Sequence, residues 1–570
     1  MKRESHLIEF LKEKSLMGVV NKYVNVDDEQ EFERFIRALS TVNIDNVILF
    51  KYLLGQKEKS LDHSNIKPCS FKDVDSYESA REYSRLGLDA LKGGRIAFLV
   101  FSGGAATRLK EQYPELREIY RARFDIDIGD DSDIPKGMVP VSPSGYFSFL
   151  HLFVEQVLKL QYEYGVIVNL IIMVSRATEA YIRQYFEDND YFGLMRRAVF
   201  FLRQNENPRL DSDGDIIFDG EKIITTGDGH GGVYRALIES HLADELVIRG
   251  VESVVMFNVD NPLARFFDLP RIGYHFAKMS DFTISAVEKT NPDEKIGVVA
   301  EDATIDRYRV VEYNLLSAEM RRRVDDNGKL MFSCGHINVN FVNLSVIDKK
   351  FAPIIYRNKK IKLKGGQILT NSLEWLNQDI VTVMEKRQVR ILGLNREDFF
   401  LPTKNVKGVD SIETTMDGMS QYYKRILDDS CRFHRNSILD ISPSFILDAN
   451  ENHRLRNLTM DENSVLFIRA NFDIDGDRLM LNRGIHLEKN STLKIICKNP
   501  FGKFDYDYIS NAARLDRVNT SKIGIQNPIV VKSGSKVILE IEEGGRLFIK
   551  SSELSGQIHL IVKSGEYKEL

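Results

Sequence analysis

Short apolar runs alternate with segments of helical periodicity over residues 95–259. The runs have the length and composition of buried strands. They span residues 95–101, 166–175, 198–202 and 254–259, and the helical segments between them span 147–160, 178–188 and 233–249. Strands that alternate with helices form a mostly parallel sheet with both faces covered. The pattern predicts a Rossmann-like α/β core, whose ligands bind outside the carboxyl ends of the strands.

Two regions with different patterns of apolar residues flank this core. Residues 1–85 carry apolar residues at helical spacing and predict an N-terminal helical segment. Residues 431–570 contain short strands broken by Gly, Asn and Ser, which predict an all-β domain, either a sandwich or a β-helix-like stack. The α/β core then occupies residues 86–430.

The charge composition argues against two classes of binding partner, nucleic acids and anionic membranes. The 78 Lys and Arg nearly balance the 83 Asp and Glu, for a net charge of −5, so no field favours a nucleic acid or an anionic membrane. The four cysteines lack zinc-site spacing, which predicts free thiols in a reducing compartment. No run approaches the roughly 18 apolar residues of a membrane span. We expect a cytoplasmic protein that binds neither nucleic acid nor membrane.

The strand at 95–101 runs into Ser102-Gly103-Gly104, followed by small residues and Arg108. Because no bulky side chain is present, backbone N–H groups can closely approach phosphate oxygens or a base edge. The delocalised charge of Arg108 suits a triphosphate. The alternative is a tight strand-to-helix turn with a surface arginine.

A lysine at position 136 lies between Pro135 and Gly137. In this restrained position it could supply a point charge to a phosphate. The alternative is an exposed lysine in a turn.

These motifs belong to a longer ordered series. The series comprises GG-x-x-TRL at 103–109, PKGM at 135–138, MVSRAT at 173–178, DNDYFG at 188–193, DGHGGVYRAL at 228–237, NVDN at 258–261, VEKTNP at 287–292, GVV at 297–299, RVVEY at 309–313, GHI at 335–337 and FLPTKN at 400–405. In this order, over roughly residues 80–430, the chain resembles the UDP-sugar pyrophosphorylases, and most of all the UDP-N-acetylglucosamine subgroup. The resemblance implies a GT-A-like nucleotidyltransferase core that joins UTP to a sugar 1-phosphate, giving a UDP-sugar and pyrophosphate.

The resemblance also implies roles for residues at matching positions. Arg108, Lys136 and Lys404 would bind the triphosphate and the charge that develops on pyrophosphate. Gly103, Gly104, Gln204 and Gly229 would hold the nucleotide. Asp260 would ligate Mg²⁺, and the sugar would lie against Asn261, Glu288, His230 and His336.

The chemistry suits these residue types. The attacking sugar-phosphate oxygen is already an anion, so no protein base is needed, and catalysis is mostly positioning and electrostatic stabilisation. Mg²⁺ keeps several waters and binds phosphate oxygens, so one aspartate is sufficient protein ligation.

Several positions depart from the family pattern. Ala106 replaces a third glycine, Lys110 replaces the glycine after the RL pair, and an insert at 111–134 lengthens the link to Lys136. Such an insert could be a lid or a partner surface. His230 and His336 stand where the N-acetylglucosamine enzymes have two asparagines facing the sugar. The sugar therefore stays open among N-acetylglucosamine, glucose and galactose, as does the oligomeric state.

Two other classes of protein compete with this hypothesis. Gly227–Gly232 fits the GxGxxG pattern of dehydrogenases, but the β-hairpin expected at 215–225, with its Asp219-Gly220 turn, is a poor entry to a βαβ unit. A non-catalytic UDP-sugar sensor with the same fold is the second alternative. Ala106 and the insert favour it, whereas the retention of every phosphate-facing charge argues against it.

Overall fold

The computed structural model describes most of the 570 residues. They are 9, 11–13, 17–25, 27–56, 63–71, 75, 81–104, 111–124, 127–128, 134–363, 366–427, 429–447, 449–470, 484–498, 503–507, 512–516, 521–525 and 528–570. The fold divides into two compact units. Unit 1 comprises residues 1–75, 202–248 and 279–393, and unit 2 comprises 76–201, 249–278 and 394–570.

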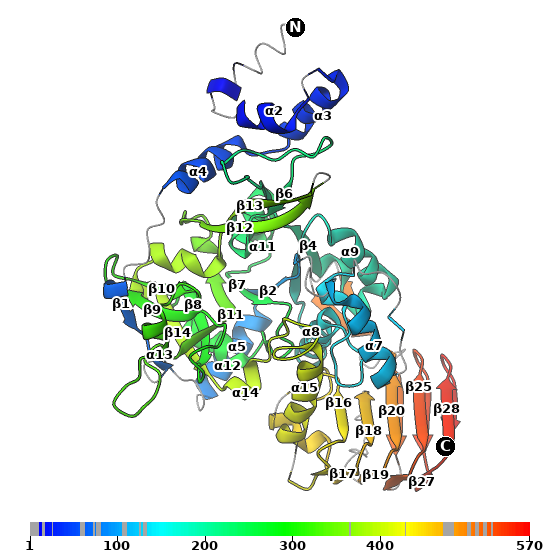
Figure 1. Ribbon diagram of the computed structural model, residues 1–570. Helices are drawn as coiled ribbons and strands as arrows, with labels where there is room; N and C mark the ends of the chain where they lie inside the picture. Colours follow the sequence, from blue (N-terminus) through cyan, green and yellow to red (C-terminus); the bar gives the residue numbers. More distant parts are fainter. Residues whose placement is uncertain are drawn as a thin grey trace. The chain divides into compact units, whose positions relative to one another are not determined.

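Unit 2 contains the parallel strands that the sequence predicts (Figure 1). Strand β2 (Ile96–Phe101) pairs in parallel with β3 (Asn169–Val174) on one side and β7 (Ser253–Asn258) on the other. Every residue of β2 and β3 is buried, as expected for a parallel sheet covered on both faces. Because the three strands are parallel, their carboxyl ends lie at one edge, and the Gly103 and Asp260 loops follow there.

Unit 2 also contains α-helices. They are α5 (Arg81–Lys92), α7 (Tyr113–Phe124), α8 (Phe149–Tyr164), α9 (Glu179–Asp188), α12 (Leu269–Ala277), α14 (Arg396–Phe399) and α15 (Ile412–Ile426). Helix α8 begins after Ser148, whose hydroxyl accepts the N–H of His151, and ends at Gly165 with φ of 64°. It is buried on most sides, charged residues included, so its polar side chains need partners in the interior.

The C-terminal strands coil into a parallel β-helix. The chain passes from sheet to sheet among three sheets, and neighbouring strands within each sheet are parallel. The strand orders are β15-β17-β19-β24-β27, β16-β18-β20-β25-β28 and β23-β26-β29. Their bounds are β15 (Arg432–Phe433), β16 (Ile438–Ile441), β17 (Leu458–Met460), β18 (Val465–Arg469), β19 (Ile485–Leu487), β20 (Thr492–Cys497), β23 (Lys522–Ile525), β24 (Ile529–Val531), β25 (Lys536–Ile541), β26 (Arg546–Ile549), β27 (Glu553–Leu554), β28 (Gln557–Val562) and β29 (Tyr567–Glu569). Leu466, Leu493 and Val537 stack in register and are fully buried. This ladder resolves the two sequence alternatives in favour of the β-helix.

Unit 1 is built mainly from antiparallel pairs. Strand β11 (Cys334–Asn343) pairs with β8 (Phe282–Glu288), and β9 (Val298–Asp302) pairs with β1 (Ile66–Pro68) and β10 (Arg307–Val311). A long ribbon is formed by β12 (Ile354–Leu363) and β13 (Gly366–Glu374). Strand β14 (Val389–Leu394) pairs with β8. The predicted parallel core is therefore confirmed for unit 2, and antiparallel strands continue the α/β fold in unit 1.

The N-terminal helices of unit 1 pack on the predicted hairpin. These are α2 (Met17–Tyr23), α3 (Glu29–Leu39) and α4 (Ile44–Gly55). Phe35 makes an edge-to-face contact with Phe218, at 5.4 Å between ring centroids, in a buried apolar cluster. The hairpin turn has the expected form, because Gly220 adopts φ of 90° and the Asp219 N–H donates to the carbonyl of Lys222.

One predicted helix is broken in two. The sequence predicts a continuous helix over 233–249, but the structure has α10 (Val233–Glu239) and α11 (Leu242–Ile248). His241 lies between them with φ of 58°, a left-handed conformation that ends a helix. Neither these nor any other described helix is both long and apolar enough to cross a membrane.

Helices α5 and α12 require glycine where they cross. A Cβ at Gly273 would lie 1.7 Å from the carbonyl oxygen of Tyr83, and one at Gly87 would lie 2.0 Å from that of Leu269. We expect Gly273→Ala to destabilise the protein by about 1–3 kcal/mol or more, because backbone must move to admit the methyl group. Gly55→Ala is the control, since no other part of the described chain lies within 4 Å of a Cβ built there. Thermal unfolding measures both, and equal melting temperatures would contradict the close crossing.

Candidate active site

Three distant segments of unit 2 meet around Lys136. The Lys136 ammonium lies 3.4 Å from Oδ2 of Asp260 and donates to the carbonyl oxygen of Thr403. The Thr403 N–H in turn donates to the carbonyl oxygen of Asp260, at 2.8 Å. The side chains of Lys136 and Asp260 are 17% and 26% exposed, so both remain accessible to a ligand. The structure therefore brings a cation and a carboxylate together at the edge where β2 and β7 end.

Asn261 holds the segment that carries Lys404. Its amide nitrogen donates to the carbonyl of Phe399 at 2.8 Å, and its amide oxygen accepts the N–H of Leu401 at 2.9 Å. The residue is 2% exposed. Both ends of the amide are thus bonded to the 399–401 backbone, which makes Asn261 a positioning residue for the following loop.

Lys404 lies in a loop closed by hydrogen bonds. Its N–H donates to the carbonyl of Asp410 at 2.6 Å, and its ammonium lies 4.0 Å from the Asp410 carboxylate. The loop leads into α15, whose first turn is closed by reciprocal hydrogen bonds between Ser411 and Thr414. The side chain of Lys404 is 32% exposed, so a backbone-fixed loop carries an accessible cation.

The glycine loop after β2 packs against the turn of Lys136. A Cβ at Gly137 would lie 2.6 Å from the Ser102 hydroxyl, so only glycine fits after the lysine. A Cβ at Gly104 would meet no described residue within 4 Å, so among these residues the backbone there is open to a ligand, and Gly103 beside it is half-buried. Ala106, Arg108 and Lys110 lie outside the described residues.

The described part of the insert at 111–134 contains helix α7. Tyr120 on this helix is fully buried and its hydroxyl donates to the carbonyl of Pro140. Gln112, next to the helix, accepts the N–H of Val406 at 3.4 Å. Within the described residues, the insert therefore supports both the chain after Lys136 and the loop of Lys404.

A second group of predicted site residues lies in unit 1. The Gln204 amide donates to the carbonyl of Gly229 at 3.1 Å. Gly229 has φ of 84°, and a Cβ there would lie 2.3 Å from the carbonyl oxygen of Trp375. Glycine is required for both reasons. Gln204 and the 229 loop, which the sequence assigns to the nucleotide, are thus held together.

His230 and His336 are buried imidazoles of this second group. The Asn377 N–H donates to Nδ1 of His230 at 3.1 Å, and Nε2 of His336 lies 3.1 Å from the amide oxygen of Asn340. Burial lowers the pKa of both to about 4, and for His230 the neighbouring His336 contributes to the lowering. Both rings are therefore neutral at neutral pH.

Glu288 lies beside His336 in the sheet of unit 1. It ends β8 directly opposite Cys334 of β11, and His336 is two positions further along that strand. Side chains two positions apart on paired strands project from the same face. Glu288 and His336 therefore share one face of this antiparallel pair.

The GxGxxG segment does not have the setting of a dehydrogenase. Strand β6 (Thr225–Gly227) pairs antiparallel with β5 (Glu206–Pro208), both only three residues long. A dinucleotide site needs a parallel βαβ unit at this position. The structure excludes that alternative for this segment.

Sequence reasoning missed a buried polar seam between α8 and the β-helix. Asp440 of β16 accepts hydrogen bonds from the Ser142 hydroxyl at 2.8 Å and the Ser144 N–H at 2.9 Å, and burial raises its pKa. Glu155 of α8 pairs with Arg469 of β18 at 2.8 Å. Although burial opposes the charged form, the Arg469 guanidinium holds the pKa of Glu155 well below its usual range. The Ser-Pro-Ser-Gly sequence at 142–145 was the only signal available.

Proteins of similar fold and sequence include UDP-N-acetylglucosamine pyrophosphorylases. A crystal structure of the UDP-N-acetylglucosamine pyrophosphorylase of Trypanosoma brucei has the same fold, with a TM-score of 0.62, 22% identity and coverage of 80% of this chain and 95% of that one. The probable UDP-N-acetylglucosamine pyrophosphorylase of Dictyostelium discoideum is 25% identical over 471 residues, which are 78% of this chain and 93% of that protein. The UDP-N-acetylglucosamine pyrophosphorylase of Saccharomyces cerevisiae is 28% identical over 298 residues, 51% of this chain and 58% of the yeast protein.

The fold thus defines a UDP-sugar pyrophosphorylase-like α/β protein. Residues 131–459 match the model of the UTP–glucose-1-phosphate uridylyltransferase family, which is more than half of the chain. The chain belongs to this family, and the resemblance seen in the sequence motifs is confirmed.

The buried ion pair predicts a large, specific loss of stability. Arg469→Met leaves Glu155 charged and unpaired in the interior, which we expect to cost about 3–5 kcal/mol. The double variant with Glu155→Gln should recover part of the loss, because no unpaired charge remains. Arg322→Met, at an exposed pair with Asp293, is the control and should cost less than about 1 kcal/mol. Chemical unfolding compares the four proteins; equal effects at both pairs would refute the seam.

The neutral histidines predict a pH dependence of stability. Their pKa is near 4 in the folded protein and near 6.5 when unfolded, so stability is present above pH 6.5 and is lost as pH falls toward 4. The loss is at most on the order of 3 kcal/mol per histidine. Replacing both with Asn should flatten this part of the profile.

Melting temperatures of the wild type and the double variant, taken from pH 7 to pH 4, give the measurement. The difference between the two proteins cancels groups that titrate in the same range. These include Asp228 and Asp379, whose pKa burial raises to about 7. If the difference in melting temperature between the two proteins does not change with pH, the pKa values of the two imidazoles are not lowered by burial.

Proposed function

We propose that this chain transfers the uridylyl group of UTP to a sugar 1-phosphate, giving a UDP-sugar and pyrophosphate. The proposal rests on one observation above all. In a member of the uridylyltransferase family, Lys136, Asp260 and the Thr403 backbone are bonded to one another where the parallel strands end. Such an edge is where α/β sheets bind their ligands.

The reaction makes modest demands on the protein. A phosphate oxygen of the sugar 1-phosphate attacks the α-phosphorus of UTP in line, forming one P–O bond. The bond from the α-phosphorus to the bridging oxygen breaks, and pyrophosphate leaves with that electron pair. Lys136, Lys404 and Arg108 would together stabilise the negative charge that develops on the transferred and leaving groups.

Mg²⁺ is part of this proposal. Among the described residues, no three His, Cys, Asp or Glu side chains gather as a metal cage. The donor set fits Mg²⁺ all the same, because Asp260 offers a partly exposed carboxylate and the triphosphate and waters supply the other oxygens. When bound, the ion would neutralise phosphate charge, and Asp260 would hold it.

The second group of residues would select the substrates. Gln204 and Gly229 would hold uracil, and the open backbone at Gly103 and Gly104 would hold the nucleotide. His230, Glu288 and His336 would contact the sugar, and Asn261 would position the loop of Lys404. Neutral imidazoles exchange hydrogen bonds with hydroxyl or acetamido groups without adding charge. We propose N-acetylglucosamine 1-phosphate or glucose 1-phosphate as the acceptor.

Pyrophosphate release from UTP and Mg²⁺ with a panel of sugar 1-phosphates tests the proposal. Lys136→Met should lower kcat by roughly 10²-fold or more, because it removes a preorganised charge from the transition state. Lys360→Met, on the exposed face of β12, should leave kcat unchanged.

The outcome separates enzyme from sensor. If UTP and UDP-sugars bind, as measured by calorimetry, but no sugar 1-phosphate in the panel releases pyrophosphate, the chain is a binding protein and the proposal fails. The melting temperature of each variant confirms that any loss of rate is not a loss of fold.

A further inference from the structure

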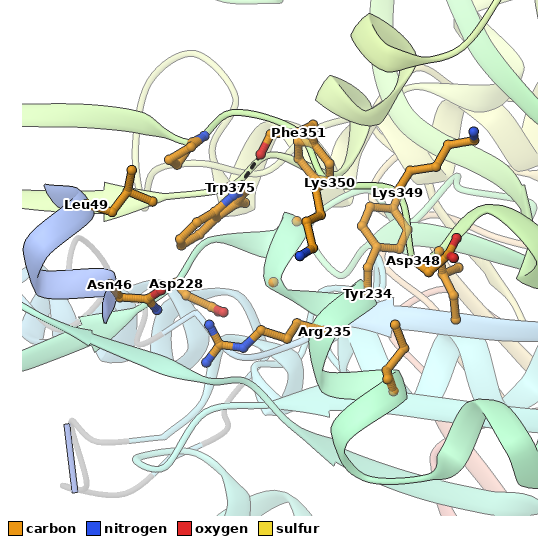
Figure 2. Close-up of a pocket in the computed structure, with 15 residues that line it drawn as sticks. Asn46, Leu49, Asp228, Tyr234, Arg235, Asp348, Lys349, Lys350, Phe351 and Trp375 are labelled. Carbon is orange, nitrogen blue, oxygen red and sulfur yellow. Dashed lines mark hydrogen bonds between the residues drawn. The ribbon is translucent and has the colours of Figure 1, made fainter. Parts of the chain in front are cut away.

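Unit 1 contains a cavity of about 410 Å³ that the proposed reaction does not use (Figure 2). Its walls come from α4, from the 228–238 segment, from residues 347–353 and from Trp375. None of Gln204, Gly229, His230, Glu288 or His336 lines it. The volume lies in the range of sites for small molecules. The cavity is therefore separate from the candidate sugar and base contacts, although it touches the loop that carries two of them.

The walls present aromatic faces to this space. The Trp375 indole N–H donates to the carbonyl of Phe351 at 3.2 Å, and the Tyr234 hydroxyl donates to the carbonyl of Asn377 at 2.8 Å. Because the polar ends of both rings are bonded to backbone, their apolar surfaces remain for a ligand. Leu49 and Ile238 add aliphatic surface at the rim and are 37% and 43% exposed. An aromatic or otherwise flat apolar body suits such walls.

The polar groups of the cavity favour an anion. Lys350 makes no ion pair with any described residue, and Figure 2 shows its ammonium directed into the space beside Trp375. Arg235 lies opposite, where its guanidinium pairs with Glu239 at 3.0 Å. Asp228 is 1% exposed, and its Oδ1 has no hydrogen-bond partner among the described residues. Burial raises the pKa of Asp228 to about 7, so its carboxyl is partly protonated and weakly repels an anion.

Trp375 is hydrogen-bonded through its backbone to the loop of the candidate site. Its N–H donates to the carbonyl of Asp228, and its carbonyl accepts the N–H of Gly231, both at 2.8 Å. Gly229 lies so close to the same carbonyl that no side chain fits there. A displacement of the Trp375 backbone would therefore be passed on to Asp228 and Gly231, between which Gly229 and His230 lie.

We propose that this cavity binds a small aromatic anion, with its ring against Trp375 and its charge on Lys350, and that occupancy changes the affinity of the neighbouring loop for UTP. The binding part stands alone. The regulatory part rests on the proposed function, because it takes Gly229 as a nucleotide contact.

The chain has one tryptophan, so selectively excited fluorescence reports on the surroundings of Trp375 alone. The probe is 4-nitrobenzoate, a flat anion that quenches indole emission, and 4-nitrobenzamide is its neutral counterpart. We expect saturable quenching by the anion and binding of the amide weaker by about tenfold, the value of one charge-assisted contact of about 1.4 kcal/mol. Lys350→Met should weaken the binding of 4-nitrobenzoate by about the same factor, whereas Lys360→Met should leave its affinity unchanged.

Two results would overturn the site. One is quenching that rises linearly without saturation, as for free N-acetyltryptophanamide measured in parallel. The other is equal affinity of wild type and Lys350→Met for the anion. Neither measurement uses turnover, so a failure of the proposed enzyme activity leaves this test intact.

Calorimetric titration of UTP, with and without saturating 4-nitrobenzoate, tests the regulation. We expect the dissociation constant of UTP to change by roughly threefold or more, with UTP changing the affinity of the probe by the same factor, as linkage requires. An unchanged dissociation constant for UTP would overturn the regulatory part. If UTP does not bind in either titration, the proposed function fails instead.

Discussion

The parallel pairing of β2 with β3 and β7 is the constraint on which the catalytic proposal depends. It aligns the carboxyl ends of three buried strands, so the glycine loop and the loop of Asp260 emerge at one edge. The 399–404 segment is then fixed there by Asn261 and by the backbone of Thr403. Lys136 completes the group by bonding to Asp260 and Thr403. Positioning of this kind is what an in-line phosphoryl transfer requires from a protein.

The β-helix contributes to this edge through buried polar contacts. Asp440 holds Ser142 and Ser144, only six and eight residues after Lys136, and the Glu155–Arg469 pair anchors the next helix. A buried charge pair is weak evidence for net stability, but it fixes one arrangement because either partner alone is costly. We infer that the β-helix holds the chain that follows Lys136 in place.

In unit 1, several candidate site residues are neutral polar groups that are held close to the backbone. Gly229 is forced by its left-handed φ and by the carbonyl of Trp375, while burial keeps His230 and His336 uncharged. The same tryptophan lines the aromatic cavity with its side chain and bonds to the candidate loop through its backbone. One side chain and its backbone thus belong to two sites in the same unit.

The sequence by itself determined the order of strands and helices in the core, its parallel pairing and the family, and it named the candidate site residues. Apolar periodicity and glycine spacing are local properties, so they can be read without a structure. The division of the site residues between two units, the bonding of Asn261 to the 399–401 backbone, the break at His241 and the choice of a β-helix depended on tertiary structure. So did the seam of Asp440 and Glu155 and the cavity beside Trp375. Each of these arises from contacts between residues far apart in the chain, and burial, which sets their charge and hydrogen bonding, exists only once those residues have come together.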